Sequence, residues 1–334
     1  MVLSALKPKG IVWTALANPA LDYRRCQNHE FDTCNWLLPT QGKETLSAAC
    51  RHNRTIPDLS EPENLELWRK MEFAKHRLIY TLLELGLPLI NQVDAPKSRL
   101  AFEFLRESKT PHGQRVSTGH DNGTITVALD EADDAKREQV RTQMGEPYRT
   151  LLGHFRHEVG HYFWNILVRD GGRLETFRDV FGREDIDYSG ALQLHYSNGP
   201  PADWQSDFVS AYASTHPWED FAETWAHYLH IVDTLETARS FGMKVHVLDE
   251  KEAAVDFDPH NAPAIEHLVE AWLPLCFTVN SLNRSMGLGD LYPFILSPKA
   301  IGKLNYVHEL IRSRRHDCEN SGNNANVNAQ GREL

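Results

Sequence analysis

The chain has 334 residues, with 35 Lys and Arg against 46 Asp and Glu, which gives a formal net charge of −11 at pH 7. This acidic balance argues against a protein that binds nucleic-acid phosphates, which needs clustered basic residues, and no apolar run reaches the roughly 18 residues of a membrane span. The start, MVLSALKPKGIVW, lacks the features of a signal peptide, so we expect a cytoplasmic protein. The five cysteines are too unevenly spaced to indicate a disulfide framework. The 17 histidines are the feature left to explain.

Residues 1–58 are rich in turn formers. They contain three of the five cysteines: Cys26, Cys34 and Cys50. A helix is predicted over 60–86, because Ser60 and Glu63 have the spacing of a capping box and Gly86 stands where a glycine ends a helix. Strands are predicted over 99–129, where side chains alternate and GTITVAL follows the turn Asp121-Asn122-Gly123.

The strand GTITVAL could present a free edge to an extended substrate, as strand addition allows. The charged segment 131–141 is interpreted as a solvated surface. Further helices are predicted over 147–168, from 216 onward, over 262–272 and over 299–312. We expect a Cys-containing segment over 1–58, one domain over 59–312 and a disordered tail over 313–334. Strands followed by helices indicate an α+β fold.

The sharpest motif is His157-Glu158-Val159-Gly160-His161. On a helix, positions i and i+4 lie about 40° apart around the axis, so both imidazoles point the same way, as two ligands of one zinc ion do. Glu158 lies at the rim, where it can reach a water molecule at the metal. The alternative is a pair of buried, hydrogen-bonded histidines. Gly160 in a helix interior indicates that another backbone comes close.

A zinc site with an open position for water needs a third protein ligand. Glu219 and Glu223 lie at i and i+4 on one predicted helix face, a like-charge pair that a cation would stabilise. The alternative is that these carboxylates compensate the helix dipole, which is our interpretation of Asp220. His227 continues the face of Glu219 two turns later, and His230 follows three residues after it. His154 lies one turn before His157. They either support the metal ligands from behind or are surface or interfacial histidines.

Long phrases of the chain resemble the bacterial zinc-binding metallopeptidases that are relatives of the gluzincins. These phrases are CNWLLP, RTIPDLSEPENLELWRK, GEPYRTLLGHFRHEVGHYFW, GPPADWQSDFVSAYASTHPWEDFAETWAHYLHIVDTLETA and NSLNRSMGLGDLYPFIL. The resemblance covers residues 20–312. It implies a zincin-like core with a small antiparallel or mixed sheet, an active-site helix and a mostly helical C-terminal part. It also implies that His157 and His161 bind zinc and that Glu158 is the general base.

Gluzincins of the lethal-factor type have a tyrosine seven residues before the glutamate ligand, which begins an E-x-F-A-E run. Here Tyr212 precedes Glu219 by seven residues, and Glu-Asp-Phe-Ala-Glu follows. This similarity implies that Glu219 binds zinc, that Glu223 supports the site from behind the ligands, and that Tyr212 offers its hydroxyl to the oxyanion. Among the histidines near the ligands, we assign the same supporting position to His227 and His154.

Members of the family often begin with a zinc ribbon, and we expect that this upstream ribbon is missing here, which leaves a remnant. Ser47 stands where the first cysteine of a pair with Cys50 is expected. Cys26, Cys34 and Cys50 could bind a structural metal, with His29 or His52 as a replacement ligand. Since a structural zinc needs four closed ligands, we expect reduced, packed cysteines and a single, catalytic zinc ion.

The sequence therefore predicts hydrolysis of peptide bonds by a zinc-activated water with Glu158 as general base. The partner is a peptide or protein substrate, with no nucleic acid and no membrane, and the oligomeric state is open. One alternative is a non-catalytic binding protein that has kept a zincin fold. Another is a zinc hydrolase of non-peptide amides, because the chemistry at the metal is shared.

Overall fold

The computed structural model describes residues 6–9, 12–16, 19–90, 99–106, 116, 118–144, 150–246 and 253–321. The chain forms two compact units. Unit 1 comprises Met1–Leu83, Pro88–Gln139 and Glu319–Leu334, and unit 2 comprises Glu84–Leu87 and Val140–Cys318. None of the described helices is long and apolar enough to cross a membrane.

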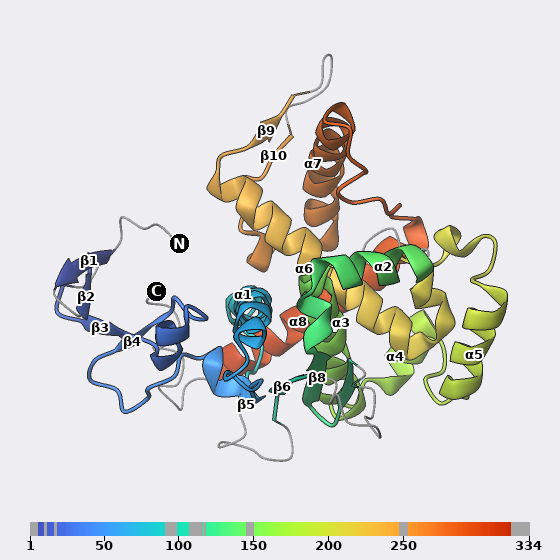
Figure 1. The fold of residues 1–334 in the computed structure, drawn as a ribbon. Helices are drawn as coiled ribbons and strands as arrows, with labels where there is room; N and C mark the ends of the chain where they lie inside the picture. Colours follow the sequence, from blue (N-terminus) through green and yellow to red (C-terminus); the bar gives the residue numbers. More distant parts are fainter. Residues whose placement is uncertain are drawn as a thin grey trace, which may run out of the picture. The chain divides into compact units, whose positions relative to one another are not determined.

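Unit 1 begins with a four-stranded antiparallel sheet, in the order β1-β2-β3-β4 (Figure 1). Its strands are β1 (Leu6–Lys9), β2 (Val12–Ala15), β3 (Asp22–Arg25) and β4 (Leu37–Pro39). We did not predict this sheet, because strands of three or four residues are too short to show a periodicity. The 3₁₀ turn η2 (Gln27–Phe31) lies between β3 and β4, and the 3₁₀ turn η3 (Cys50–His52) follows β4 along the chain.

A second, mixed sheet of unit 1 has the order β5-β6-β8-β7. Its strands are β5 (Asn53–Thr55), β6 (Ala101–Leu105), β7 (Gly119–Asp121) and β8 (Thr124–Ala128). The β7–β8 hairpin turns at Asn122 and Gly123, whose φ angles of 45° and 81° match a two-residue hairpin turn. Since β8 pairs with β6 on one side and with β7 on the other, the hypothesis that GTITVAL forms a free edge is wrong.

Helix α1 (Pro62–Glu84) of unit 1 matches the predicted helix over 60–86. Gly86, with φ of 68°, follows its end and takes the left-handed conformation that a glycine adopts most easily. The apolar side chains Trp68, Met71, Leu78 and Leu82 of α1 are fully inaccessible to solvent. The charge-dense segment after β8 forms the short turn η4 (Leu129–Ala132) and the mostly exposed helix α2 (Asp134–Met144), as expected for a solvated surface.

Unit 2 is mostly helical (Figure 1). Its longer helices are α3 (Leu151–Phe163), α4 (Leu174–Phe181), α5 (Tyr188–Asn198), α6 (Pro217–Ser240), α7 (Ile265–Ser285) and α8 (Pro298–Ser321). Its short elements are the π-helical η5 (Trp164–Arg169), the 3₁₀ turns η6 (Trp204–Ser206), η7 (Tyr212–Thr215) and η8 (Pro259–Asn261), and the hairpin strands β9 (Lys244–Val245) and β10 (Ala253–Ala254). Together with unit 1, this is the mixed α+β fold that the sequence predicts.

Two regions differ from the sequence-based expectations. Helix α8 continues to Ser321, so the segment after residue 313 begins as helix, and residues 322–334 lie outside the described part of the chain. Asp220 is fully buried, and its Oδ2 lies 2.6 Å from Nζ of Lys303 on α8. Asp220 stands in the first turn of α6, as expected for a charge at a helix N-terminus, but its carboxylate also belongs to a buried ion pair with Lys303.

Helices α3 and α6 pack at the centre of unit 2, and Gly160 makes this packing possible. A Cβ atom at position 160 would lie 3.0 Å from Cα of Ala222 and 3.2 Å from Cβ of Trp225. The prediction that another backbone approaches Gly160 is therefore confirmed. One turn on, the rings of Phe163 and Trp225 are stacked with centroids 4.9 Å apart.

Candidate metal centre

Helix α3 carries His157 and His161 on the face that meets α6. The hydroxyl of Thr150 caps this helix by accepting a hydrogen bond from the N–H of Gly153 at 3.0 Å. The two imidazole rings follow one another by one turn, with centroids 4.9 Å apart. This is the side-by-side arrangement that the spacing of the two residues predicts.

The first turn of α6 carries Glu219 to the same place. Nδ1 of His216 accepts a hydrogen bond from the N–H of Trp218 at 3.1 Å, and Pro217 opens the helix. Oε2 of the buried Glu219 lies 3.0 Å from Nε2 of His157 and 3.5 Å from Nε2 of His161. These three ligand atoms all lie within 4.8 Å of one another.

The three atoms fit a zinc ion chemically. Two imidazole nitrogens and one carboxylate oxygen form a donor set of catalytic zinc, with ligand distances of about 2.0–2.2 Å and one position left open. Oε2 of Glu219 is buried and has no hydrogen-bond partner among the described residues. A buried carboxylate oxygen without such a partner is costly, and a cation between His157, His161 and Glu219 would satisfy it.

Glu223, one turn after Glu219, lies behind His157. Its Oε1 accepts a hydrogen bond from Nδ1 of His157 at 2.6 Å, and its Oε2 accepts one from the hydroxyl of Ser210 at 2.6 Å. Burial alone would raise the pKa of Glu223, but the hydrogen bond from His157 lowers it to about 2. The ionised carboxylate fixes the imidazole with Nδ1 protonated, which leaves Nε2 as the ligand atom.

Tyr188 on α5 holds the other oxygen of Glu219, and no motif in the sequence indicates this contact. Its hydroxyl donates a hydrogen bond to Oε1 of Glu219 at 2.7 Å, which directs Oε2 toward the histidines. Burial would raise the pKa of Glu219, but the neighbouring His161 and His157 hold it well below its ordinary value. Trp218 was also missed: its ring lies 3.8 Å, between centroids, from that of His161.

Glu158 and Tyr212 are the two residues to which we assigned proton transfer and oxyanion binding. Glu158 is half-buried on α3, beside the first histidine, and the described part of the chain offers its carboxylate no hydrogen bond or ion pair. Such a carboxylate is available to accept a proton. The ring centroid of Tyr212 on η7 lies 6.0 Å from that of His157, and burial raises the pKa of its phenol. The hydroxyl is therefore a hydrogen-bond donor at neutral pH.

The remaining histidines lie outside the group of three ligand atoms. Nδ1 of His227 lies 2.6 Å from the hydroxyl of Tyr292, and burial lowers the pKa of His227 to about 4. His154 lies one turn before His157 on α3, and it does not belong to the group of His157, His161 and Glu219. His230 lies 3.3 Å from Nη1 of Arg156. The supporting position that we assigned to His227 and His154 stays a prediction.

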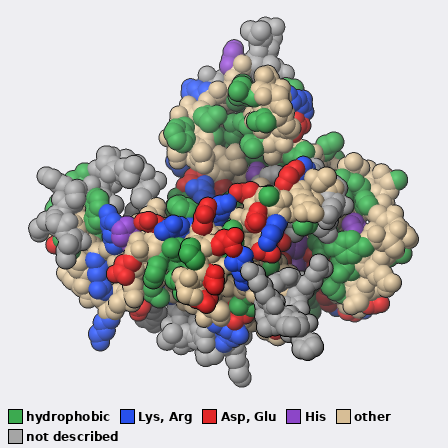
Figure 2. Space-filling view, in the orientation of Figure 1, with side chains coloured by type: hydrophobic (Ala, Val, Ile, Leu, Met, Phe, Trp, Pro, Cys, Tyr) green, Lys and Arg blue, Asp and Glu red, His purple; other side chains and the backbone are tan. Residues whose placement is uncertain are grey.

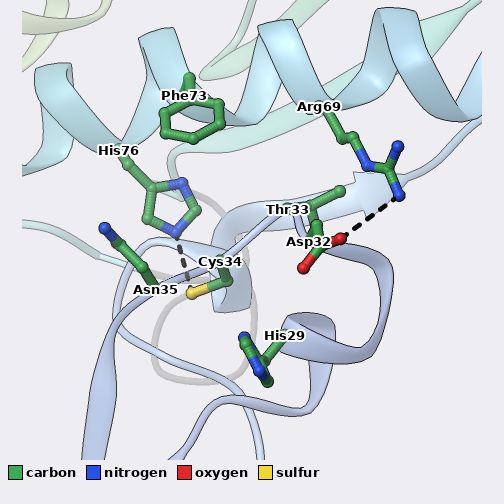
Figure 3. Close-up of a pocket in the computed structure, with 8 residues that line it drawn as sticks. All are labelled: His29, Asp32, Thr33, Cys34, Asn35, Arg69, Phe73 and His76. Carbon is green, nitrogen blue, oxygen red and sulfur yellow. Dashed lines mark hydrogen bonds and ion pairs between the residues drawn. The ribbon is translucent and has the colours of Figure 1, made fainter.

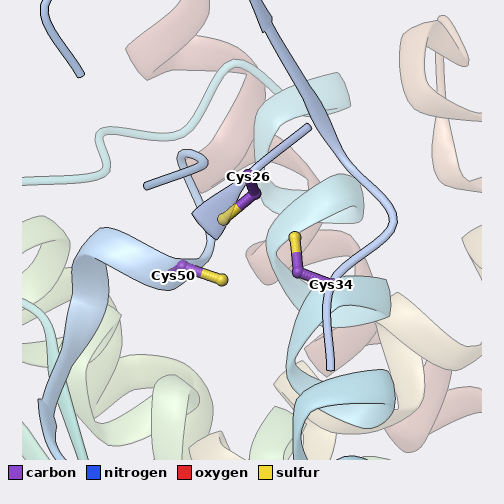
Figure 4. Close-up of side chains that lie close together, drawn as sticks. All are labelled: Cys26, Cys34 and Cys50. Atoms are coloured by element: carbon purple, nitrogen blue, oxygen red, sulfur yellow. The ribbon is translucent and has the colours of Figure 1, made fainter. Parts of the chain in front are cut away.

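The three N-terminal cysteines come together in unit 1 (Figure 4). The sulfurs of Cys26, Cys34 and Cys50 lie within 4.8 Å of one another, and all three residues are buried. Neither histidine that we considered as a fourth ligand belongs to this group. Nδ1 of His52 contacts the carbonyl oxygen of Leu100 at 2.8 Å, and His29 contacts Arg25.

Comparison with known proteins decides the family. The sequence model of the family described as "putative zinc-binding metallo-peptidase" matches residues 64–310. The chain belongs to this family. It is 42% identical over 301 residues to uncharacterized proteins of Mycobacterium tuberculosis (strain H37Rv) and Mycobacterium bovis, a match that covers 89% of this chain and 85% of each relative. No solved structure matches the chain.

The comparisons also correct our description of the N-terminus. A zinc-ribbon domain matches residues 1–61, which include Cys26, Cys34 and Cys50. The expectation that the ribbon is missing is therefore wrong. The ribbon is hard to recognise in the sequence because Ser47 stands where a cysteine was expected and because the three cysteines are widely spaced.

Proposed function

We propose that this member of the zinc-binding metallo-peptidase family is an active zinc peptidase of the gluzincin type. One observation carries the proposal: Oε2 of Glu219 lies within 3.5 Å of Nε2 of both His157 and His161 and lacks a hydrogen-bond partner among the described residues. These three residues would supply the metal ligands that such an enzyme needs, and Glu158, on the helix of the two histidines, would supply the base.

Zinc, when bound, lowers the pKa of a water molecule from about 16 to about 7 and polarises the scissile carbonyl. The residues of this chain then have separate tasks. Glu158 accepts a proton from the attacking water and passes it to the leaving amine. The hydroxyl of Tyr212 donates a hydrogen bond to the carbonyl oxygen as that oxygen becomes negative. Glu223 keeps His157 oriented throughout, because it is hydrogen-bonded on both of its oxygens.

The substrate class that we propose is a peptide or protein. On the face in Figure 2, basic and acidic side chains of the described residues are interspersed. Nucleic-acid binding needs basic residues gathered in one patch. The acidic net charge of −11 agrees with this assignment.

The test is incubation of the zinc-loaded full chain with a diverse peptide library, read out by mass spectrometry. Glu158→Gln is the matched control, because Gln has the shape of Glu but cannot accept the proton. Cleavage by the wild type alone supports the proposal. No cleavage by the wild type would favour a binding protein, and release of small acyl groups without cleavage of peptide bonds would favour a hydrolase of other amides.

A further inference from the structure

The cysteine cluster of unit 1 has the features of a metal site. Its three sulfurs come from separate parts of the ribbon: Cys26 follows β3, Cys34 lies between η2 and β4, and Cys50 opens η3. Figure 4 shows the three side chains directed toward one another. Backbone N–H groups point at two of the sulfurs, from Ser47 to Cys26 at 3.2 Å and from Trp36 to Cys34 at 3.4 Å. Such bonds stabilise thiolates, the form that binds zinc.

Three thiolates leave a tetrahedral site one ligand short. Ser47 stands where the missing cysteine was expected. Its hydroxyl lies 3.4 Å from Sγ of Cys34 and accepts a hydrogen bond from the N–H of Cys50 at 3.2 Å, so it already has partners within the cluster. A serine hydroxyl is also not among the usual ligands of zinc, which are Cys, His and carboxylates. The fourth ligand must therefore come from another element.

His76 on α1 is in the right place to be this ligand (Figure 3). Its Nε2 lies 3.1 Å from Sγ of Cys34 and 3.8 Å from Sγ of Cys50. Ligand atoms around a tetrahedral zinc ion are separated by about 3.5–3.8 Å, given Zn–S and Zn–N distances of about 2.3 and 2.1 Å. The ring is buried, and the sulfurs that it contacts are those of Cys34 and Cys50.

The tautomer of His76 is also set for metal binding. Its Nδ1 lies 2.6 Å from the backbone carbonyl oxygen of Glu72, and a carbonyl oxygen can only accept. Nδ1 therefore carries the proton, and Nε2 presents its lone pair to the sulfurs. A backbone carbonyl behind a histidine ligand is a common support in zinc sites.

Glu72 is the other side chain with a ligand atom near this place, and its contacts give it a different task. Its Oε1 accepts hydrogen bonds from Nε1 of Trp68 at 3.1 Å and Nδ2 of Asn53 at 2.8 Å, and lies 2.8 Å from Nζ of the buried Lys75. Its Oε2 remains 4.0 Å from Sγ of Cys50. The carboxylate is held by these partners, behind the ligands.

We propose that Cys26, Cys34, Cys50 and His76 bind one structural zinc ion in a closed Cys₃His site. The three cysteines lie in the part of the chain that matches the zinc ribbon, and His76 lies in the part that matches the peptidase family. The ion thus fastens the ribbon to the first helix of the peptidase part, and its binding free energy contributes to the folding of unit 1. This replaces our expectation of a single zinc ion. It is independent of the proposed peptidase activity.

The test counts zinc in the reduced full chain after removal of loosely bound metal, by elemental analysis. The background is His157→Ala/His161→Ala, which removes the ligands on α3, so one zinc ion per chain should remain. Adding Cys34→Ser should abolish it, and adding His76→Ala should weaken it at least about 100-fold, more than the loss of a supporting partner costs. His52→Gln, at a buried histidine outside the cluster, should keep it.

Cobalt substitution in the same background identifies the fourth ligand even where His76→Ala unfolds the ribbon. The unchanged cluster should give the absorption spectrum of a tetrahedral ion with three thiolates. His76→Cys should convert it into that of a four-thiolate site with a stronger charge-transfer band. An unaltered spectrum in His76→Cys, undiminished zinc in His76→Ala, or no zinc in the background protein would each overturn the proposal.

Discussion

The two candidate metal centres are built in opposite ways. The His–Glu centre of unit 2 takes its ligands from two helices, α3 and α6, in which residues one turn apart share a face. The cysteine cluster of unit 1 takes its sulfurs from loops and a 3₁₀ turn, and its proposed fourth ligand from a helix. Helical periodicity makes the first centre visible in the sequence. The second depends on contacts such as that between Cys34 and His76, which no local spacing encodes.

The two proposed centres also differ in the number of metal positions that protein ligands fill. The proposed His–Glu centre has three protein ligands, which leaves one position of a tetrahedral zinc ion for water, whereas the proposed Cys₃His site fills all four positions with protein ligands. Closed sites are structural and open sites are catalytic. Variants that affect one centre and leave the other unchanged therefore test this comparison.

The largest effect is expected for Glu219→Ala. Loss of one of three protein ligands should remove most of the zinc at the His–Glu centre, so the count per chain should fall from two to one, and hydrolysis should cease. Elemental analysis after dialysis measures this, with Glu175→Ala, at a highly exposed side chain on α4, as the control. Undiminished zinc in Glu219→Ala would refute the assignment of the third ligand.

Tyr212→Phe should leave both zinc ions bound and slow catalysis. Loss of one donor to an oxyanion typically lowers kcat by about 10²–10³-fold. The measurement is kcat on the best substrate of the peptide library. If the variant cleaves it at the wild-type rate, Tyr212 has no part in binding the oxyanion.

Tyr188→Phe should have a smaller effect on the His–Glu centre, and this effect should be on its affinity for zinc. The variant keeps the ring but loses the hydrogen bond to Oε1 of Glu219, so zinc should bind the His–Glu centre about 10–100-fold more weakly. Competition with a chelator measures this affinity. The cysteine cluster should hold its ion as before. Equal affinities in variant and wild type would show that Tyr188 does not position Glu219.

Gly160→Ala should give the smallest change, a loss of stability. The new methyl group would meet the backbone of Ala222 at 3.0 Å, and overpacking of about 1–3 kcal/mol exceeds the gain of about 1 kcal/mol in helix propensity. Gly302→Ala is the matched control on α8, where a Cβ meets nothing within 4 Å, and should stabilise by up to about 1 kcal/mol. Urea unfolding compares them. Similar stabilities would show that α3 and α6 can move apart at no cost.

Much of the helical fold could be predicted from the sequence because each helix carries its own signals. The end of α1 near Gly86 could be predicted from the glycine, and the close approach of another backbone to α3, which is that of α6, could be predicted from Gly160. The sheet of β1 to β4 could not be predicted, since its short strands form only through tertiary pairing. The central position of β8 was missed for the same reason: the order of strands depends on long-range contacts.

The residues of the candidate site also divide into those that the sequence predicts and those that only the structure reveals. His157, His161 and Glu219 could be proposed from helical spacing and from the resemblance to the family, and the structure brings them together. Tyr188 and Ser210 could not, because each reaches its carboxylate from a separate segment and belongs to no motif. His76 was overlooked because the search for a fourth ligand stayed near the cysteines in the sequence, whereas α1 returns past them in space.

The most direct test of the central claim compares wild type and Glu158→Gln at equal zinc content. Both should carry the same number of zinc ions, because Glu158 is not a ligand. The account predicts that kcat/KM for one library peptide falls by about 10²–10⁴-fold in the variant, the contribution typical of a general base. Hydrolysis at the wild-type rate by zinc-loaded Glu158→Gln would contradict it.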